Sequence, residues 1–403
     1  MSEGGITRRA VLAALPFSFT VPPSDPYRPP RVRQIALPEF PGRHAVWGAT
    51  GQDRVGRVWV GVSAEGGDKS GRLFRYDASS RRMLPMGDVL TALRRLGSRP
   101  DGESQIKLHT RITEAADGWL YFASTDEEGE AEDGSAPPRW GSHLWRIRPE
   151  GGAWEHLAEV PEGLTCTTAT GRTVWALGLW GHVLYRWDTQ LRRLGRVVVG
   201  SVPGHMSRNI IADERGHVFI PRVTLEAGNL VAELVEFEPN IMREVARTRL
   251  DRYAEGKSPA GAHGITGVLT MVDRSMIIAT SIGYLYRIIP GNTPGQPSTV
   301  RPLGYLHPEG PTYVPSLFTW DGRRFLMGLA RRQKADWTTE TWDWVVHDLT
   351  TATSRPQPFP HGIAPVPLLY GSQTRDADGR FYLGGRRRAG DDRLPVLLQV
   401  ETG

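Results

Sequence analysis

A repeated pair of landmarks constrains the fold of this chain more than any other feature of its sequence. The first landmark is a turn followed by a strand rich in aromatic or β-branched residues. It begins at Asp53, Asp117, Gly171, Asp213, Asp273, Asp321 and Asp378. The second is a shorter alternating strand downstream, such as LFRYD ending at Asp77 or LLQVE ending at Glu401. Both landmarks occur seven times in 403 residues, at a spacing of roughly 40–70 residues, which is typical of a repeat architecture.

Each repeat supplies three or four antiparallel strands, the size of a propeller blade. The last repeat ends one strand short, at LPVLLQVETG, while the segment RVRQIALPEF (31–40) near the other end alternates like the missing strand. The sequence therefore predicts an all-β, seven-bladed β-propeller, closed by an N-terminal strand that completes the last blade. An eighth, degenerate blade in the insert 87–104 is the alternative. A helix on a connection explains that insert more simply.

The first thirty residues carry a different pattern. Arg8 and Arg9 precede a short apolar run, which resembles a twin-arginine export signal, and a Pro-rich stretch follows. We therefore expect an export-signal-like segment and linker over 1–30, a single propeller domain over 31–403, and a periplasmic or secreted location. A disordered tail on a cytoplasmic protein is the alternative. No apolar run is long enough to span a membrane.

Charge and cysteine content narrow the classes of ligand. The net charge is +5 and the basic residues are scattered, which favours an anionic ligand but gives no stripe for nucleic acid. The single cysteine, Cys166, excludes an internal disulfide and a cysteine-based metal site. A lone small residue in an inner strand is usually part of the core. We expect a monomer with no nucleic-acid partner.

The loops that lead into the innermost strands of a propeller form one mouth of its central channel, so a site there takes residues from several repeats. At these positions the sequence gathers cationic and aromatic side chains with few acidic ones. They are His44, Trp47, Lys107, His109, Arg111, His205, Arg208, Asn209, His263, Tyr313, Tyr370, Gln373 and Arg375. One buried histidine is usually structural, but histidines at equivalent points of four repeats indicate a functional mouth.

Three chemistries fit this set of residues. Imidazoles are common ligands of divalent metals, so a metal on the channel histidines is one. Arginines bind carboxylate or sulfate in a bidentate manner, so anion binding is the second. The third is β-elimination on a uronic-acid polysaccharide, in which cations neutralise the carboxylate while a base and an acid move protons.

Two stretches resemble a known family. They are similar to signatures of seven-bladed propeller polysaccharide lyases, the ulvan lyases and their relatives. The first stretch runs from His109 to Arg111 and is followed by DGWLYFAS, and the second is PGHMSRNIIADERGHVFIPR (203–222). The resemblance implies that His109 and Arg208 belong to an active site. Two positions depart from the family pattern: Ser124 follows the second repeat's inner hairpin where a histidine is expected, and VWALGLWGH (174–182) lacks the expected tyrosine.

The leading interpretation is a polysaccharide lyase acting on an acidic glycan at the channel mouth. The candidate base is His109 or His205, Arg208 neutralises the carboxylate with Arg111, and Tyr313 or Tyr370 donates the proton. The candidate substrate-binding residues are Lys107, Arg111, Asn209, His263, Gln373 and Arg375. A non-catalytic propeller that binds an anionic ligand or a protein partner is the alternative, and a metal-dependent hydrolase or isomerase comes third.

Overall fold

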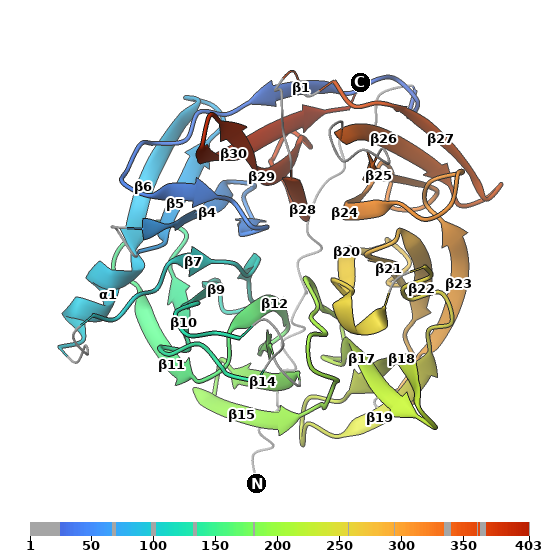
Figure 1. The fold of residues 1–403 in the computed structure, drawn as a ribbon, viewed down its shortest axis with the longest axis horizontal. Coiled ribbons are helices and arrows are strands. Elements are labelled where there is room, and N and C mark those ends of the chain that lie inside the picture. Colours follow the sequence, from blue (N-terminus) through green and yellow to red (C-terminus); the bar gives the residue numbers. More distant parts are fainter. Residues whose placement is uncertain are drawn as a thin grey trace, which may run out of the picture.

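The computed structural model describes residues 25–402 except 67–69, 98–101, 132–134, 180–181, 257, 294, 334–339, 361 and 363–367. These residues form a ring of β-sheets around a central axis, with β12, β20, β24 and β28 nearest the centre (Figure 1). The chain is thus a β-propeller, as the repeats predict. Most of the export-signal-like segment lies outside the described residues, so its role stays a prediction.

Five of the sheets are four-stranded antiparallel blades. The first contains β12 (Leu164–Thr170), β13 (Thr173–Gly178), β14 (Val183–Asp188) and β15 (Arg193–Val198). The second contains β16 (Ile211–Ala212), β17 (Val218–Glu226), β18 (Asn229–Phe237) and β19 (Glu244–Arg249). The third contains β20 (Ile265–Thr270), β21 (Met276–Thr280), β22 (Tyr284–Ile289) and β23 (Thr299–Tyr305). The fourth contains β24 (Tyr313–Thr319), β25 (Phe325–Gln333), β26 (Glu340–Asp348) and β27 (Thr353–Pro358).

The fifth blade closes the ring. It contains β28 (Leu368–Arg375), β29 (Phe381–Ala389), β30 (Asp392–Glu401) and, from the other end of the chain, β1 (Arg31–Gln34). β1 pairs antiparallel with β30, from Arg31 opposite Glu401 to Gln34 opposite Leu398, and Figure 1 shows the blue β1 beside the red β30. The edge that β30 would otherwise expose is therefore covered.

The prediction of seven separate blades is wrong. The five four-stranded blades are accompanied by one ten-stranded sheet that holds the strands of the first two repeats together. Its strands are β2 (Arg43–Ala45), β3 (Thr50–Gln52), β4 (Val58–Ala64), β5 (Arg72–Asp77), β6 (Arg82–Asp88), β7 (Lys107–Leu108), β8 (Ile112–Glu114), β9 (Leu120–Thr125), β10 (Ser142–Ile147) and β11 (Glu155–Val160).

A glycine explains how the first two repeats join. The inner strands β3 and β8 pair in parallel, with Gly51 opposite Ile112 and Gln52 opposite Thr113. A Cβ atom on Gly51 would lie 1.8 Å from the carbonyl oxygen of Ile112. The two backbones can approach this closely only because Gly51 has no side chain.

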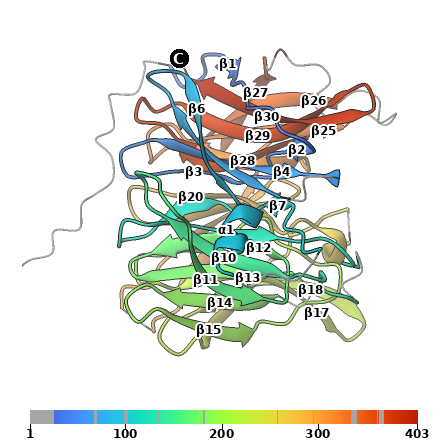
Figure 2. The ribbon, with the colours of Figure 1, turned by 90° about the vertical axis from the view of Figure 1, so that its left-hand side faces the viewer.

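The insert between the first two repeats forms a helix, as predicted. The helix α1 (Val89–Arg95) is capped by Asp88, whose carboxylate accepts a hydrogen bond from the backbone N–H of Thr91 at 2.9 Å. It lies on the outside of the ring, as Figures 1 and 2 show. A short 3₁₀ helix, η2 (Pro259–Gly261), precedes β20. Within the described chain, no helix has the length and apolarity that a membrane crossing requires.

The hydrophobic core lies between neighbouring sheets. Trp175 and Leu184 of the β12–β15 blade pack with Val218 and Val235 of the next blade, and the same cluster holds Cys166, which is fully buried. Burial raises the pKa of the Cys166 thiol to about 12, so this cysteine is an unreactive core residue. Inner strands such as β13 are buried throughout, whereas outermost strands such as β15 alternate between partly buried and exposed residues.

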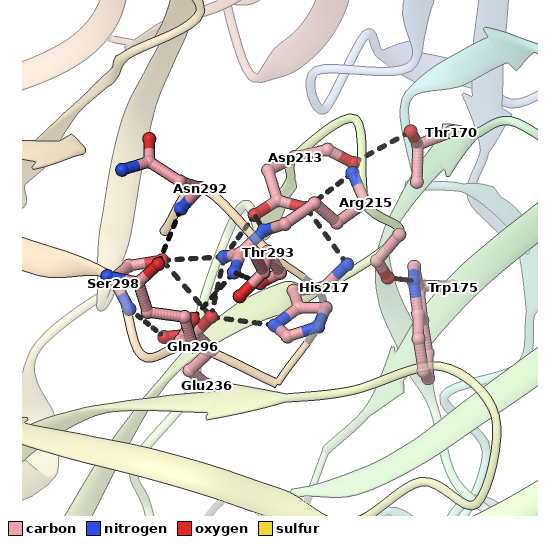
Figure 3. Close-up of polar contacts among 11 residues, drawn as sticks. Thr170, Trp175, Asp213, Arg215, His217, Glu236, Asn292, Thr293, Gln296 and Ser298 are labelled. Atoms are coloured by element: carbon pink, nitrogen blue, oxygen red, sulfur yellow. Dashed lines mark hydrogen bonds and ion pairs between the residues drawn. The ribbon is translucent and has the colours of Figure 1, made fainter. Parts of the chain in front are cut away.

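The turn that starts at Asp213 connects three successive blades (Figure 3). Its backbone carbonyls accept hydrogen bonds from the preceding blade: the hydroxyl of Thr170 donates to Asp213 at 2.8 Å, and the indole of Trp175 donates to Gly216 at 3.1 Å. Within the turn, the Asp213 carboxylate accepts the backbone N–H groups of Arg215 and His217.

Arg215 extends this network to the following blade. Its guanidinium donates to the Asp213 carboxylate at 2.6 Å, to Glu236 of β18 at 2.8 Å, and to the carbonyl of Gln296 in the β22–β23 loop, also at 2.6 Å. Glu236 in turn accepts hydrogen bonds from His217 and from the backbone of Ser298 (Figure 3). Burial alone would raise the pKa of the Glu236 carboxyl, but these hydrogen bonds and the Arg215 charge together lower it below its ordinary value.

We expect Gly51→Ala to lower the free energy of unfolding by at least about 1 kcal/mol, because the new Cβ forces β3 away from β8. Chemical denaturation followed by tryptophan fluorescence measures this change. The matched control is Gly261→Ala, whose added Cβ would meet no atom within 4 Å and should change stability by less than about 0.5 kcal/mol. Equal losses in both variants would contradict the packing argument.

We expect Glu236→Gln to destabilise the protein at neutral pH by about 3 kcal/mol, because it breaks a buried ion pair. The folded pKa of Glu236 is below its ordinary 4.5, so the carboxylate stabilises the fold above that pH and loses its effect as the pH falls through the folded value. The variant should therefore show a shallower loss of stability on acidification than the parent.

Urea unfolding between neutral and acidic pH tests this expectation. Glu214→Gln, which alters an exposed surface pair with Arg274, is the control and should keep the acid dependence of the parent. Parallel pH profiles for the parent and Glu236→Gln would show that Glu236 does not contribute to acid sensitivity.

Candidate functional site

One end of the central channel carries a small pocket, here called the mouth pocket. It is lined by Trp47, Gly48, His109, Arg111, Arg208, Asn209, Thr266, Tyr313, Pro315 and Tyr370. These residues lie at or just before the starts of inner strands, which is why repeats far apart in the chain converge here. Four of the five predicted catalytic residues and two of the predicted substrate-binding residues line the pocket: His109, Arg208, Tyr313, Tyr370, Arg111 and Asn209.

His109 holds Arg208 in place. The Nδ1 atom of His109 lies 3.0 Å from the carbonyl oxygen of Thr165, so Nδ1 carries the proton and donates it. The Nε2 atom then accepts a hydrogen bond from the Arg208 guanidinium at 2.9 Å. Burial, and then the charges of Arg208 and Lys107, lower the pKa of His109 well below its ordinary value. The imidazole is therefore neutral at physiological pH, and Arg208 occupies its lone pair.

Aromatic rings support the cations of the mouth. The guanidinium of Arg208 lies 5.0 Å from the ring centre of Tyr370, and the Tyr370 ring centre lies 5.3 Å from that of Trp47. Trp47 in turn has Lys107 at 5.0 Å and Arg386 at 4.7 Å from its ring. Stacking on a π face stabilises a cation and leaves its N–H edges available for an anion.

The lining of the mouth pocket has an excess of positive charge. Among its described lining residues, none is acidic, while Arg111 and Arg208 are both cationic. Burial lowers the pKa of Arg111 to about 10, which still leaves it charged at neutral pH. Two glutamates near the pocket already have partners. Glu127 pairs with Lys107, and a carboxylate oxygen of Glu65 lies 2.7 Å from Nδ1 of His44.

Three buried polar atoms of the mouth have no hydrogen-bond partner in the part of the chain that the structure describes. They are the indole nitrogen of Trp47, Nε of Arg208 and the amide oxygen of Asn209. The Asn209 amide is oriented by its NH₂ group, which donates to the carbonyl of Thr266 at 2.8 Å. Buried polar groups are normally paired, so these two donors and one acceptor are exceptions among the described residues.

The mouth pocket is small. Its cavity volume is about 10 Å³, which corresponds to about one water molecule. Tyr313 forms one wall; burial raises its pKa to about 12, with opposing effects from Arg208 and Tyr370, so the phenol keeps its proton at neutral pH. The ring of His263 lies 5.9 Å from that of Tyr313, just outside the lining.

The structure places His205 elsewhere. Its Nδ1 contacts the hydroxyl of Ser201 at 2.7 Å, its Nε2 contacts that of Tyr253 at 2.6 Å, and its ring lies 4.6 Å from His182. The expectation that His205 faces the mouth is therefore wrong. The backbone N–H of His205 bonds back to the carbonyl of Val202, and this turn directs the side chain into a buried cluster between strands.

Two further predicted residues lie on β28 beyond the mouth. Gln373 donates to the carbonyl of Val268 across the channel. Arg375 donates to the carbonyl of Thr319, and its guanidinium lies 4.4 Å from the ring centre of Phe381, near the opposite end of the inner strand. Their expected places in the mouth are wrong, because β28 runs from the mouth toward the other face and only Tyr370 stays beside the pocket.

The channel histidines do not form a metal centre among the described residues. A group of described residues with metal-ligand spacing lies instead at the turn shown in Figure 3 and consists of Asp213, His217 and Glu236. Arg215 donates to both of its carboxylates, so a guanidinium supplies the positive charge that a cation would. These hydrogen bonds explain the cluster as a contact that stabilises the fold.

The sequence did not single out Gly48, Thr266 or Pro315, which line the pocket through small or backbone surfaces. Trp47 belongs to the predicted mouth but was not assigned a role in binding. Its position before the first inner strand, equivalent to that of His109 in the second repeat, is the signal that identifies it.

No protein-family model and no curated protein matches this sequence. Solved propellers resemble the fold. The C-terminal WD40 domain of Sif2 aligns with a TM-score of 0.52 at 10% identity, over 91% of this chain and 98% of that domain. YCF48 bound to the D1 peptide aligns with a TM-score of 0.52 at 10% identity, over 95% of this chain and 98% of YCF48. At this identity the likeness establishes the fold alone: the chain is a β-propeller.

Proposed function

We propose that this protein is a non-catalytic propeller that binds an anionic group of a protein partner at its channel mouth. The observation that carries the proposal is the mouth pocket itself: Arg111 and Arg208 share a lining that has no acidic side chain among its described residues. A guanidinium donates charge-assisted hydrogen bonds to the oxygen atoms of such a group, often in a bidentate manner.

The contacts of Arg208 favour binding over chemistry. His109 and Tyr370 fix its guanidinium from two sides, so little side-chain entropy is lost when an anion arrives. The same contacts occupy the lone pair of His109, which a general base would need. A propeller with this fold, YCF48, has been solved with a bound peptide, which supports a protein partner as a reasonable occupant of such a ring.

We expect acetate to bind the parent protein and to shift the indole N–H resonance of Trp47, identified by its loss in Trp47→Phe. Arg208→Gln should weaken acetate binding by at least about tenfold, since a hydrogen bond to a charged group contributes a power of ten or more. NMR titration measures both effects.

The control is Arg274→Gln. Arg274 lies on an exposed turn at the other end of the inner strand β20, with a side chain that is 72% exposed, and its variant should bind acetate like the parent. Equal binding by the parent and Arg208→Gln would refute a site at the mouth.

A second candidate is β-elimination on a uronic-acid glycan, as the resemblance to ulvan lyases implies. The observation in its favour is that His109, Arg208, Tyr313 and Tyr370 share one pocket. In that reaction Arg208 would leave His109 and pair with the uronate carboxylate. Nε2 of His109 would take the α-proton, and Tyr313 would protonate the departing glycosidic oxygen, which leaves an unsaturated uronate.

We expect no increase in ultraviolet absorbance from unsaturated uronate when the parent protein is incubated with a panel of acidic polysaccharides. An increase that disappears in both His109→Ala and Tyr313→Phe would replace the binding proposal with β-elimination. An increase that disappears on adding a chelator would show that the elimination depends on a metal ion.

A further inference from the structure

The hairpin of β29 and β30 extends past the strands on either side of it. The two strands stay paired to their tip, where Ala389 lies opposite Asp392. Among the described residues, β28 pairs with β29 only as far as Arg386, and β1 pairs with β30 only over residues 398–401. The end of the hairpin, residues 386–394 and here called the arm, is therefore a two-stranded extension of the last blade.

One face of the arm carries three arginines. Arg386 and Arg388 are two residues apart on β29, so their side chains share a face, and Arg393 of β30 lies directly opposite Arg388. Arg388 and Arg393 are exposed. In the part of the chain that the structure describes, neither makes an ion pair or a side-chain hydrogen bond. Like charges directly opposite each other destabilise a strand pair, so stability of the fold does not explain this arrangement.

These arginines continue a cationic surface that begins beside the mouth. Arg386 lies 4.7 Å from the ring centre of Trp47, and Lys107 lies 5.0 Å from the same ring. Burial lowers the pKa of Arg386, and the nearby charge of Arg393 lowers it further. Cations that are close enough to repel one another concentrate positive potential at this surface, which favours an anionic ligand.

Acidic residues border this surface at both ends. Glu65 and Glu127 lie at the mouth end and are already paired with cationic or imidazole side chains. Asp391 is in the turn at the tip, and Asp392 follows it at the start of β30. A polyanion with a charge on every unit would bring some of its charges against these carboxylates. A polypeptide can place acidic residues opposite the arginines alone, and so avoids that repulsion.

The aromatic ring beside the arm is already surrounded. Trp47 has Lys107, Arg386, His44 and Tyr370 within 5.5 Å of its ring centre. Single-stranded nucleic acids gain much of their binding energy by stacking bases on open aromatic rings. The surroundings of Trp47 therefore favour a ligand that is recognised by its charge.

The spacing of the arginines matches an extended peptide. Residues two apart on a strand, such as Arg386 and Arg388, are separated by about 6.7 Å along it. Alternate side chains of an extended polypeptide repeat at the same distance. A segment with an acidic residue at every second position can therefore place a carboxylate beside each of these arginines, while its other side chains point away from the arm.

We propose that the arm binds an acidic segment of a protein partner in an extended conformation. Alternate carboxylates of that segment pair with Arg386, Arg388 and Arg393. This contact goes beyond the proposed function, because it lies outside the mouth pocket and does not require Arg208.

The test is calorimetric titration of the full-length protein, at low salt, with a peptide in which four glutamates alternate with alanine. The parent should bind this peptide and should not bind the same peptide with glutamine in place of glutamate. The double variant Arg388→Gln with Arg393→Gln should bind the acidic peptide about fivefold more weakly, the combined effect of two exposed ion pairs.

The matched control is the double variant Arg82→Gln with Arg301→Gln. It removes two exposed arginines from the outermost strands β6 and β23, lowers the net charge equally, and should bind like the parent. Because the change at Arg388 and Arg393 relieves a repulsion, the urea midpoint of that variant should be no lower than that of the parent. A lower midpoint, or equal weakening in both double variants, would overturn the inference.

The remaining outcomes separate the arm from the mouth pocket. Peptide binding that depends on Arg388 and Arg393, with no binding of acetate, would support this inference and overturn the proposed function. Acetate binding that depends on Arg208, with equal affinities for the glutamate and glutamine peptides, would do the reverse. Tighter binding of tetragalacturonate than of the acidic peptide would assign the arm to a glycan and overturn the inference.

Discussion

Closure of the ring depends on the pairing of β1 with β30, since those two strands come from opposite ends of the propeller domain. Without β1 the last blade would have three strands and an open edge. Arg33 strengthens the contact by donating to the side chains of Gln399, at 2.9 Å, and Tyr76, at 3.0 Å. Closure also assembles the mouth: Trp47 follows β1 closely in the chain and Tyr370 belongs to β28, and their rings come within 5.3 Å.

Two polar networks, one at the turn around Arg215 and one at the mouth, each hold an arginine guanidinium inside the protein. They do so through different contacts. At the turn around Arg215, a buried guanidinium is paired with the carboxylates of Asp213 and Glu236. At the mouth, the guanidinium of Arg208 is held by a neutral imidazole and an aromatic ring. The first arrangement is electrically satisfied within the protein and stabilises the fold. The second leaves a net positive charge that no acidic residue of the described pocket lining offsets, which is the condition for attracting an anion from outside.

Much of the ring could be predicted from the sequence, because turn residues and period-two alternation fix where strands begin and end. The same reasoning predicts His109 and Arg208 near the starts of inner strands, and both line the mouth pocket. The joining of the first two repeats could not be predicted, since alternation does not identify a strand's partner and the parallel contact depends on the missing side chain of Gly51. The place of His205 was missed because its partner Tyr253 lies 48 residues further along the chain.

The contact between His109 and Arg208 bears on whether such a mouth binds or catalyses. Catalysis by His109 needs a free lone pair on Nε2, and the carbonyl of Thr165 fixes the tautomer in which Nε2 is the acceptor. Arg208 then fills that acceptor, and its stacking on Tyr370 opposes its departure. Binding needs the reverse: an arginine held rigidly with part of its N–H edge unused. The same few contacts therefore favour recognition of an anion and disfavour proton transfer, even though the residue types suit both.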